Sequence, residues 1–130
     1  MNQEALTKTM LEAETWAVVG VSANPDKYGN RIFQALRRHG YRVYAVNPAH
    51  SEIDGEPCYP DLSSLPERPE VVNLVVSSEI GAEVVEEAAR LGVPYLWFQP
   101  GTHEPDLIQR AEALGMQPLR HCVLVALANG

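Results

Sequence analysis

The chain has 130 residues, of which 45% are hydrophobic, and its formal net charge is −7 at pH 7. A chain of this size buries one core, so we expect a single domain over residues 1–130. Its negative net charge argues against a broad nucleic-acid-binding surface, although a local anion site is still allowed. No apolar run approaches the roughly 18 residues of a membrane span and the N-terminus is too polar for a secretion signal, so we expect a cytoplasmic protein with no membrane partner.

Alternating apolar runs and amphipathic stretches follow one another along the chain. Residues 3–14 predict an N-terminal helix. Short runs rich in β-branched and aromatic residues predict buried strands, and apolar residues at helical spacing between them predict helices that end near a glycine. In chain order, the predicted strands are 16–21, 42–46, 71–76, 95–98 and 117–119, and the helices between them end before Gly40, Gly92 and Gly115.

This alternation predicts the fold class. Strands that alternate with helices form right-handed crossovers and a parallel sheet that is covered on both faces. We therefore expect an α/β, doubly wound Rossmann-like domain, with a mostly parallel sheet of about five strands flanked by helices. Residues 47–70 lack a long helical pattern and contain the turn signal Asp54-Gly55, so we expect an ordered excursion with at most a short helix near the sequence DLSSL.

The first turn between a strand and a helix lies in the sequence AVVGVSANPDKYGNRIF. In a doubly wound sheet, ligands bind beyond the carboxyl ends of the strands, where the strand order reverses. Gly20 ends the strand and Gly29 opens the helix, whose backbone amides would form a phosphate site with Lys27 and Arg31 nearby. We expect Gly29 to adopt positive φ beside the phosphate. Alternatively, the two glycines serve only a tight connection and close packing.

Other phosphate-binding patterns are absent from the sequence. Gly20 and Gly29 do not form the dinucleotide fingerprint G-x-G-x-x-G, and no Gly-Lys-Ser/Thr of a P-loop occurs. The second strand is followed by the sequence VNPAH, without the acidic residue that holds the ribose diol of NAD. The sequence therefore disfavours an ordinary NAD domain and nucleotide hydrolysis.

Several stretches resemble a known family. The sequence "VVGVS" with the proline and glycine that follow it, "VNP" followed by "IDGEPCY", and "WFQPG" are similar to those of the small bacterial CoA-binding proteins. These proteins are related to the N-terminal Rossmann-like domain of the succinyl-CoA synthetase alpha subunit. The resemblance extends from about residue 11 to residue 123, and it implies CoA or an acyl-CoA as the ligand.

The resemblance also implies where the ligand binds. It places the first loop around the CoA diphosphate, the second loop near the adenine and its 3′-phosphoribose, and the third beside the adenine or the pantetheine arm. The cofactor-binding residues expected in these loops are Gly20, Ser22, Lys27, Tyr28, Gly29 and Asn30 in the first, Asn47, Pro48 and His50 in the second, and Val76, Ser77 and Ser78 in the third. At the position of His50 the synthetase domain has a lysine.

The sequence leaves three functions open. The leading hypothesis is a CoA or acyl-CoA binding module without catalysis of its own. The alternative is a small enzyme that acts on a CoA thioester or a CoA disulfide with Cys122 as nucleophile, although neighbouring residues such as His121 and Cys122 rarely point at one another. A third hypothesis is a subunit that assembles with a larger chain. The histidines show no metal-ligand spacing, so we expect no metal site, and we expect Cys58 and Cys122 to be reduced and at least partly buried.

Overall fold

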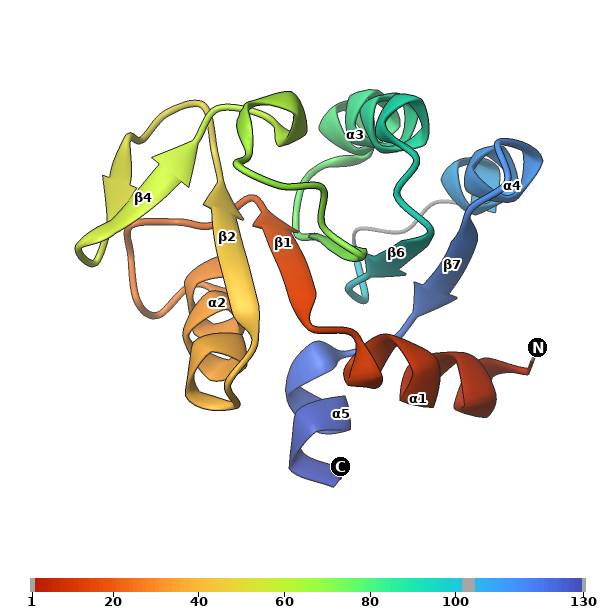
Figure 1. Cartoon of the computed structure of the whole chain (residues 1–130), viewed down its shortest axis with the longest axis horizontal. Helices are drawn as coiled ribbons and strands as arrows, with labels where there is room; N and C mark the ends of the chain where they lie inside the picture. The colour runs from red at the N-terminus through yellow and green to blue at the C-terminus, as the bar shows by residue number, and fades with distance from the viewer. Residues whose placement is uncertain (1, 102–104, 130) are drawn as a thin grey trace.

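A mixed sheet lies between two layers of helices in the computed structural model, which describes residues 2–101 and 105–129 (Figure 1). The strands are β1 (Thr15–Val19), β2 (Arg42–Val46), β3 (Glu52–Ile53), β4 (Glu56–Tyr59), β5 (Val71–Leu74), β6 (Tyr95–Phe98) and β7 (Gln117–Arg120). The helices are α1 (Gln3–Glu12), α2 (Tyr28–Arg38), the 3₁₀ helix η1 (Leu62–Ser64), α3 (Ser78–Leu91), α4 (Pro105–Ala113) and α5 (Val123–Asn129).

The strand order confirms the doubly wound fold. The sheet has seven strands in the order β3-β4-β2-β1-β5-β6-β7. Neighbouring strands are parallel except for the antiparallel pair β3 and β4. From β1 the chain builds one half of the sheet through β2, and from β5 it builds the other half through β6 and β7. The strand order therefore reverses between β1 and β5, and ligands of such sheets bind beyond the carboxyl ends of the strands at this point.

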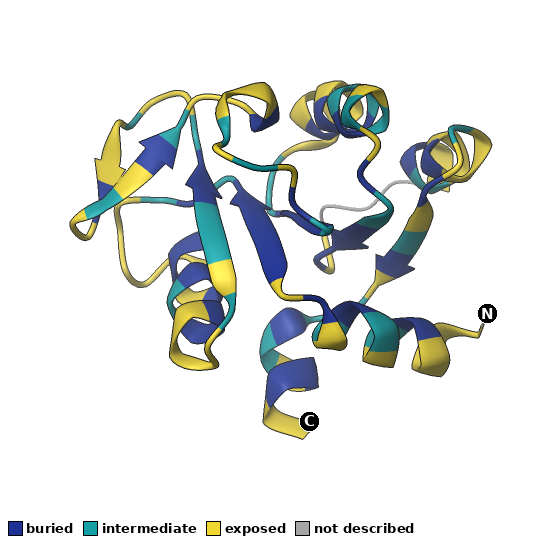
Figure 2. Ribbon diagram, viewed as in Figure 1, coloured by how far each residue is buried: buried dark blue, intermediate teal, exposed yellow. Residues whose placement is uncertain are grey.

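Each face of the sheet has its own hydrophobic core. Trp16 and Val18 of β1 pack on the face covered by α1, α2 and α5, and Ala17 and Val19 pack on the opposite face against α3, α4 and η1. All five residues of β1 are buried, as Figure 2 shows by its uniform dark colour. A strand buried on both faces has a continuous apolar sequence, which is why the run after Thr15 predicted it.

Two predicted strands are shorter than expected. The runs 16–21 and 71–76 continue beyond the strands, because β1 ends at Val19 and β5 ends at Leu74. Gly20 turns the chain with φ of +100°, and the N–H of Val75 donates to the carbonyl of Val19 in the last bond of that pair. The apolar residues that follow both strands therefore lie in loops at the carboxyl edge of the sheet.

The excursion after β2 contains a hairpin that the sequence analysis did not predict. Asp54 and Gly55 form its turn with φ of +52° and +82°, as their turn signal predicted. The strands escaped prediction because β3 has only two residues and β4 contains Pro57, a residue that usually marks an edge or a break. The short helix expected near DLSSL is confirmed as η1. Helix α5 was not predicted.

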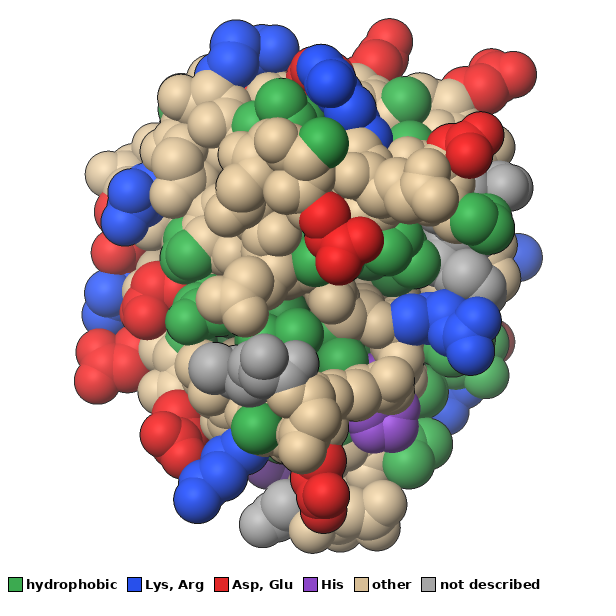
Figure 3. Space-filling model, turned by 90° about the vertical axis from the view of Figure 1, so that its right-hand side faces the viewer, with side chains coloured by type: hydrophobic (Ala, Val, Ile, Leu, Met, Phe, Trp, Pro, Cys, Tyr) green, Lys and Arg blue, Asp and Glu red, His purple; other side chains and the backbone are tan. Residues whose placement is uncertain are grey.

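The surface drawn in Figure 3 carries acidic and basic side chains interspersed with one another. Its view is from the side on which α4 and β7 lie in Figure 1. Among the described residues, no helix has both the length and the apolar character needed to cross a membrane.

Candidate functional site

The loop after β1 is held tightly against the loop after β5. The N–H of Gly20 donates to the carbonyl of Val46 at 2.9 Å, which ties the end of β1 to β2. A Cβ atom on Gly20 would lie 2.1 Å from the carbonyl oxygen of Val75. With its positive φ, this position requires glycine for two separate reasons. The switch point is therefore a place of close backbone approach.

Because Gly29 has no side chain, the first turn of α2 packs closely against the end of β1. A Cβ atom on Gly29 would lie 2.3 Å from the carbonyl oxygen of Gly20. The expectation of positive φ at Gly29 is wrong, since the positive-φ glycines of the described chain include Gly20 but not Gly29. Close packing is thus one role of both glycines, and it brings the N-terminus of α2 to the switch point.

Side chains within this loop fix its shape. Ser22 Oγ accepts a hydrogen bond from the N–H of Asn24 at 3.0 Å, and Asn24 Oδ1 accepts one from the N–H of Asp26 at 2.9 Å. The buried Asn30 donates through Nδ2 to the carbonyl of Ser22 at 2.8 Å and to Asp54 Oδ2 at 3.1 Å. Because the amide nitrogen of Asn30 already has these partners, the side chain of Asn30 braces the loop.

The N-terminus of α2 lacks a side-chain cap. Its N-cap residue, Lys27, has extended backbone angles of −81° and 149° and makes no capping hydrogen bond within the part of the chain that the structure describes. By contrast, Asn2 caps α1 and Ser77 caps α3. The first N–H groups of a helix have no partner within the helix, and they carry the positive end of its dipole. The start of α2 is therefore a place where an anion can be bound.

Two cations lie at this helix start. Lys27 is exposed, and the guanidinium carbon of Arg31 lies 5.2 Å from the centre of the Tyr28 ring. Tyr28 itself is 56% exposed, which is unusual for a large aromatic side chain. Asp26 is an acidic neighbour in the same turn. Asp54 is a second acidic neighbour, since it accepts from Asn30 of the same helix, so two cations and two carboxylates surround the start of α2.

The loop after β2 is joined to the loop after β1. Asn47 donates through Nδ2 to the carbonyl of Val21 at 2.8 Å and accepts through Oδ1 from the N–H of Ala49 at 2.9 Å. His50 is half-buried, and its N–H donates to the carbonyl of Asn47 at 3.4 Å. The side chain of Asn47 therefore positions Pro48 and His50 beside the switch point.

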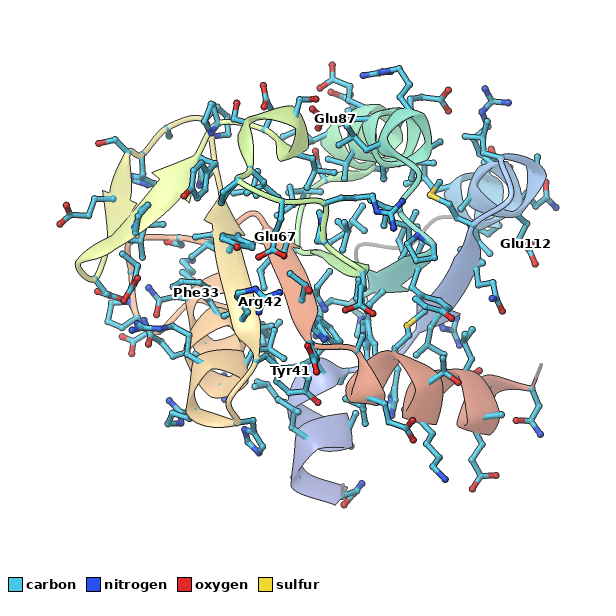
Figure 4. All side chains as sticks on the ribbon, viewed as in Figure 1. Phe33, Tyr41, Arg42, Glu67, Glu87 and Glu112 are labelled. Atoms are coloured by element: carbon cyan, nitrogen blue, oxygen red, sulfur yellow. The ribbon has the colours of Figure 1, made fainter. Side chains whose placement is uncertain are left out.

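A cavity of about 280 Å³ lies over the ends of β1 and β2, and we call it the Pro48 cavity. Glu87 of α3 lies on its rim, where it accepts hydrogen bonds from the N–H groups of Leu62 and Ser63, and Figure 4 labels it on the side of α3 that faces η1. Four of the lining residues are charged, namely Asp61, Glu83, Glu87 and Arg90. The other seven are apolar, and they are Val19, Val46, Pro48, Pro60, Leu62, Ile80 and Val84.

A second cavity of about 300 Å³ lies on the other side of the switch point, and we call it the Tyr28 cavity. Gln99 donates through Nε2 to Cys122 Sγ at 3.7 Å and accepts through Oε1 from the N–H of Val123 at 2.8 Å. The lining residues are Tyr28, Val75, Gln99, Pro100, Gly101 and Cys122. Tyr28 is also the first residue of α2, so this cavity adjoins the uncapped helix start.

Ligand cavities commonly enclose about 300–1,000 Å³, so the Pro48 cavity and the Tyr28 cavity are each suited to one part of a large ligand. A larger cavity of about 710 Å³ is lined by α1, α5 and His121. It shares no residue with the α2 turn. We therefore place the candidate site at the switch point.

His121 and Cys122 face different cavities. The ring of His121 stacks on Trp97 with centroids 5.8 Å apart, whereas Cys122 lines the Tyr28 cavity. The expectation that both cysteines are at least partly buried is confirmed, since Cys58 is buried and Cys122 half-buried. Among the described residues, no group of three His, Cys, Asp or Glu side chains is arranged to hold a metal ion.

The structure brings only some of the predicted residues to the two cavities. Pro48 lines one and Tyr28 the other, while His50, Val76, Ser77 and Ser78 are not among the residues that line either. Val76 instead packs near Gly20, and Ser77 caps α3. The wall residues Leu62, Ile80 and Val84 were not predicted from the sequence, because their apolar side chains are typical of ordinary core-facing positions.

Comparisons with known proteins identify relatives over most of the chain. A family model described as "CoA binding domain" matches residues 14–128. The chain is 42% identical over 77 residues to acetate–CoA ligase (ADP-forming) I of Archaeoglobus fulgidus; the match covers 59% of this chain but only 11% of that protein. It is 29% identical over 113 residues to the uncharacterized protein YneT of Bacillus subtilis, covering 86% of this chain and 84% of that one. A hypothetical protein from Pyrococcus horikoshii OT3 superposes with a TM-score of 0.92 at 30% identity, over 99% of this chain and 92% of that one.

Proposed function

The chain belongs to the family of CoA binding domains, as its sequence resemblance predicted, and from this premise we propose that it binds CoA or an acyl-CoA without catalysis of its own. The observation that carries the proposal is the uncapped N-terminus of α2, fixed at the switch point between the Pro48 cavity and the Tyr28 cavity. CoA has an anionic diphosphate between an aromatic base and a long neutral arm. This order of chemical groups fits the order of the three features.

The diphosphate would lie at the start of α2. The first N–H groups of a helix have no partner within the helix, so those of Tyr28, Gly29 and Asn30 would bind the anion, which the helix dipole further stabilises. Lys27 would add a charge-assisted contact. Ser22 would act by holding the loop in shape, since its hydroxyl accepts from Asn24.

The adenine would enter the Pro48 cavity, whose seven apolar lining residues suit a flat aromatic base. His50 would lie toward the 3′-phosphate, outside this cavity. The pantetheine arm would pass Tyr28 and enter the Tyr28 cavity, with Val76 and the hydroxyl groups of Ser77 and Ser78 on the loop between the two cavities. Each assignment follows from the position of these residues at the carboxyl edge.

The catalytic alternative uses Cys122 as a nucleophile. An activated cysteine needs a base within hydrogen-bond reach. The partner that the structure gives to Cys122 Sγ is the amide of Gln99, and His121 lines a different cavity, together with α1 and α5. This arrangement favours binding without turnover, and it is the reason for preferring a binding module.

Isothermal titration calorimetry with CoA and with NAD tests the choice of ligand. We expect CoA to bind at least about tenfold more tightly than NAD, a difference of about 1.4 kcal/mol, because the loop after β2 offers Asn47 and Pro48 where an NAD domain offers a carboxylate. The side-chain amide of Asn47 is already hydrogen bonded to Val21 and Ala49, so it is a poor substitute for a carboxylate that would bind the ribose of NAD. Equal affinities for the two ligands would refute the proposal.

Replacing His50 tests the position of the 3′-phosphate. Dephospho-CoA lacks only this group, so the ratio of the two affinities isolates it. In His50→Lys an ammonium group would gain a charge-assisted contact of about 1.5–3 kcal/mol, and the preference for CoA should rise about tenfold. In His50→Ala the preference should fall below that of the original chain. If all three proteins show the same ratio by calorimetry, His50 does not contact the 3′-phosphate.

A further inference from the structure

The Tyr28 cavity contains a thiol at the end where the arm of CoA would finish. Cys122 is half-buried and lines the cavity together with Tyr28, which also begins the proposed diphosphate site. One cavity therefore connects the start of α2 to the sulfur atom of Cys122. A ligand anchored by its phosphates at α2 would place its free end in the same cavity as this sulfur.

The polar group beside the sulfur is held in a fixed position. Gln99 is 4% exposed, and its Oε1 accepts from the N–H of Val123 at 2.8 Å. This bond orients Nε2 toward Cys122 Sγ, to which it donates at 3.7 Å. The amide of Gln99 therefore keeps a fixed contact with the sulfur atom of Cys122, which lines the cavity.

A second polar side chain lies below the same cavity. Asn73 of β5 is fully buried and is paired in register with Val18 and Trp97. Strand alternation places it on the same face of the sheet as Val75 and Gln99, which line the cavity, and one row nearer the strand beginnings. Among the described residues, neither atom of its amide has a hydrogen-bond partner. Asn73 is not among the residues that line the cavity, but a buried amide without a partner is rare in folded proteins, and the pantetheine arm has two amides.

We propose that the Tyr28 cavity receives the thiol end of CoA, and that Cys122 exchanges with CoA disulfide to retain one CoA as a mixed disulfide. This inference rests on the CoA binding proposed above. In the exchange, Cys122 Sγ attacks one sulfur of CoA disulfide, the old sulfur–sulfur bond breaks, and a new one joins Cys122 to CoA. The released CoA thiolate takes up the proton that Cys122 lost, so one thiol is oxidised and one is formed.

The expected signature is a rate that depends on recognition of the nucleotide. Binding of one CoA half at α2 makes the attack intramolecular, with an effective concentration that raises the rate by about 100-fold over an unanchored disulfide. Glutathione disulfide presents the same bond without a nucleotide. Adenosine 3′,5′-bisphosphate presents the 3′-phosphate without a thiol, and it should slow the exchange by competition.

The test is intact-mass spectrometry of the reduced protein, freed of reductant and incubated under nitrogen with each disulfide. Three proteins are compared: the original chain, Cys122→Ser and Cys58→Ser. Cys58 is the matched control, because burial raises the pKa of its thiol and its sulfur points to the carbonyl of Asn47. Peptide mapping of the original chain locates the adduct independently of how well either variant folds. Calorimetry with CoA in the presence of reductant is run in parallel.

We expect one CoA per chain, on Cys122, in the original protein and in Cys58→Ser but not in Cys122→Ser. The mixed disulfide should form about 100-fold faster with CoA disulfide than with glutathione disulfide. Adenosine 3′,5′-bisphosphate should slow its formation from CoA disulfide. Equal rates with both disulfides, an adduct on Cys58, or no adduct on a protein that binds CoA in the calorimeter would overturn the inference and leave the proposed function intact. Absence of calorimetric binding would overturn the proposed function itself.

Discussion

Replacing Gly20 with alanine is expected to lower the free energy of unfolding by about 2–5 kcal/mol. The new Cβ would lie 2.1 Å from the carbonyl oxygen of Val75, so the backbone of one loop must move. Forcing a side chain into a left-handed conformation costs about 1–2 kcal/mol, and overpacking adds about 1–3 kcal/mol. Urea unfolding followed by circular dichroism measures the difference.

Gly40→Ala is the matched control for Gly20→Ala. Gly40 also has positive φ, +89°, but a Cβ there would meet no atom within 4 Å. This variant should therefore show only the conformational part of the loss, about 1–2 kcal/mol. If Gly20→Ala is no less stable than Gly40→Ala, the loops at the switch point are not packed as closely as described.

Replacing Lys27 with aspartate is expected to weaken CoA binding by roughly 100-fold while raising the stability of the fold. Lys27 already has N-cap backbone angles, and an aspartate at an N-cap accepts from the first N–H groups, a gain of about 0.5–2 kcal/mol. Those N–H groups are the ones proposed to bind the diphosphate. In the variant, the aspartate side chain would therefore occupy the N–H groups that the diphosphate needs. The variant also loses the charge-assisted contact of Lys27 with the diphosphate, which is worth about 1.5–3 kcal/mol.

The control for Lys27→Asp is Lys8→Glu in α1. Lys8 is exposed, and its replacement changes the net charge of the chain by the same amount. Calorimetry with CoA and thermal unfolding are measured on both variants. An affinity for CoA that falls no further in Lys27→Asp than in Lys8→Glu would mean that the diphosphate binds elsewhere.

The strands and helices around the candidate site were predicted correctly, because local sequence patterns determine them. Continuous apolar runs predict strands buried on both faces, and alternation with helices determines a parallel order. These two features place the turn between Gly20 and Gly29 beyond the carboxyl end of a central strand. The position of the candidate site therefore followed from the fold class alone, and the family resemblance added the proposed ligand.

The geometry of the individual residues did not follow from the sequence. Gly29 was assigned positive φ, yet glycine is required there by the carbonyl of Gly20, which is distant enough in sequence that no local pattern reveals the contact. Asn30 was expected near the diphosphate, but its side chain braces the loop through Ser22 and Asp54. The turn at Asp54 was predicted, but the hairpin around it and the contact of Asp54 with α2 were not.

The two cavities were the least predictable part of the site. Their walls combine side chains from different halves of the chain, such as Pro48 with Ile80 and Tyr28 with Cys122. An apolar residue that lines a cavity has the same helical spacing as one in a closed core. Helix α5, which follows Cys122, has only seven residues, too few for a clear periodic pattern.

The central claim is that CoA binds at the start of α2, and an amide NMR titration of the nitrogen-15-labelled protein with CoA tests it most directly. We predict that the largest shifts will occur at Ser22, Tyr28, Gly29 and Asn30, where the diphosphate meets the free N–H groups of the helix. The amides of Gln3–Glu12 in α1 should remain nearly unchanged, although that helix lines the cavity of about 710 Å³. Shifts confined to α1 and α5, or no shifts at a saturating excess of CoA, would contradict the account.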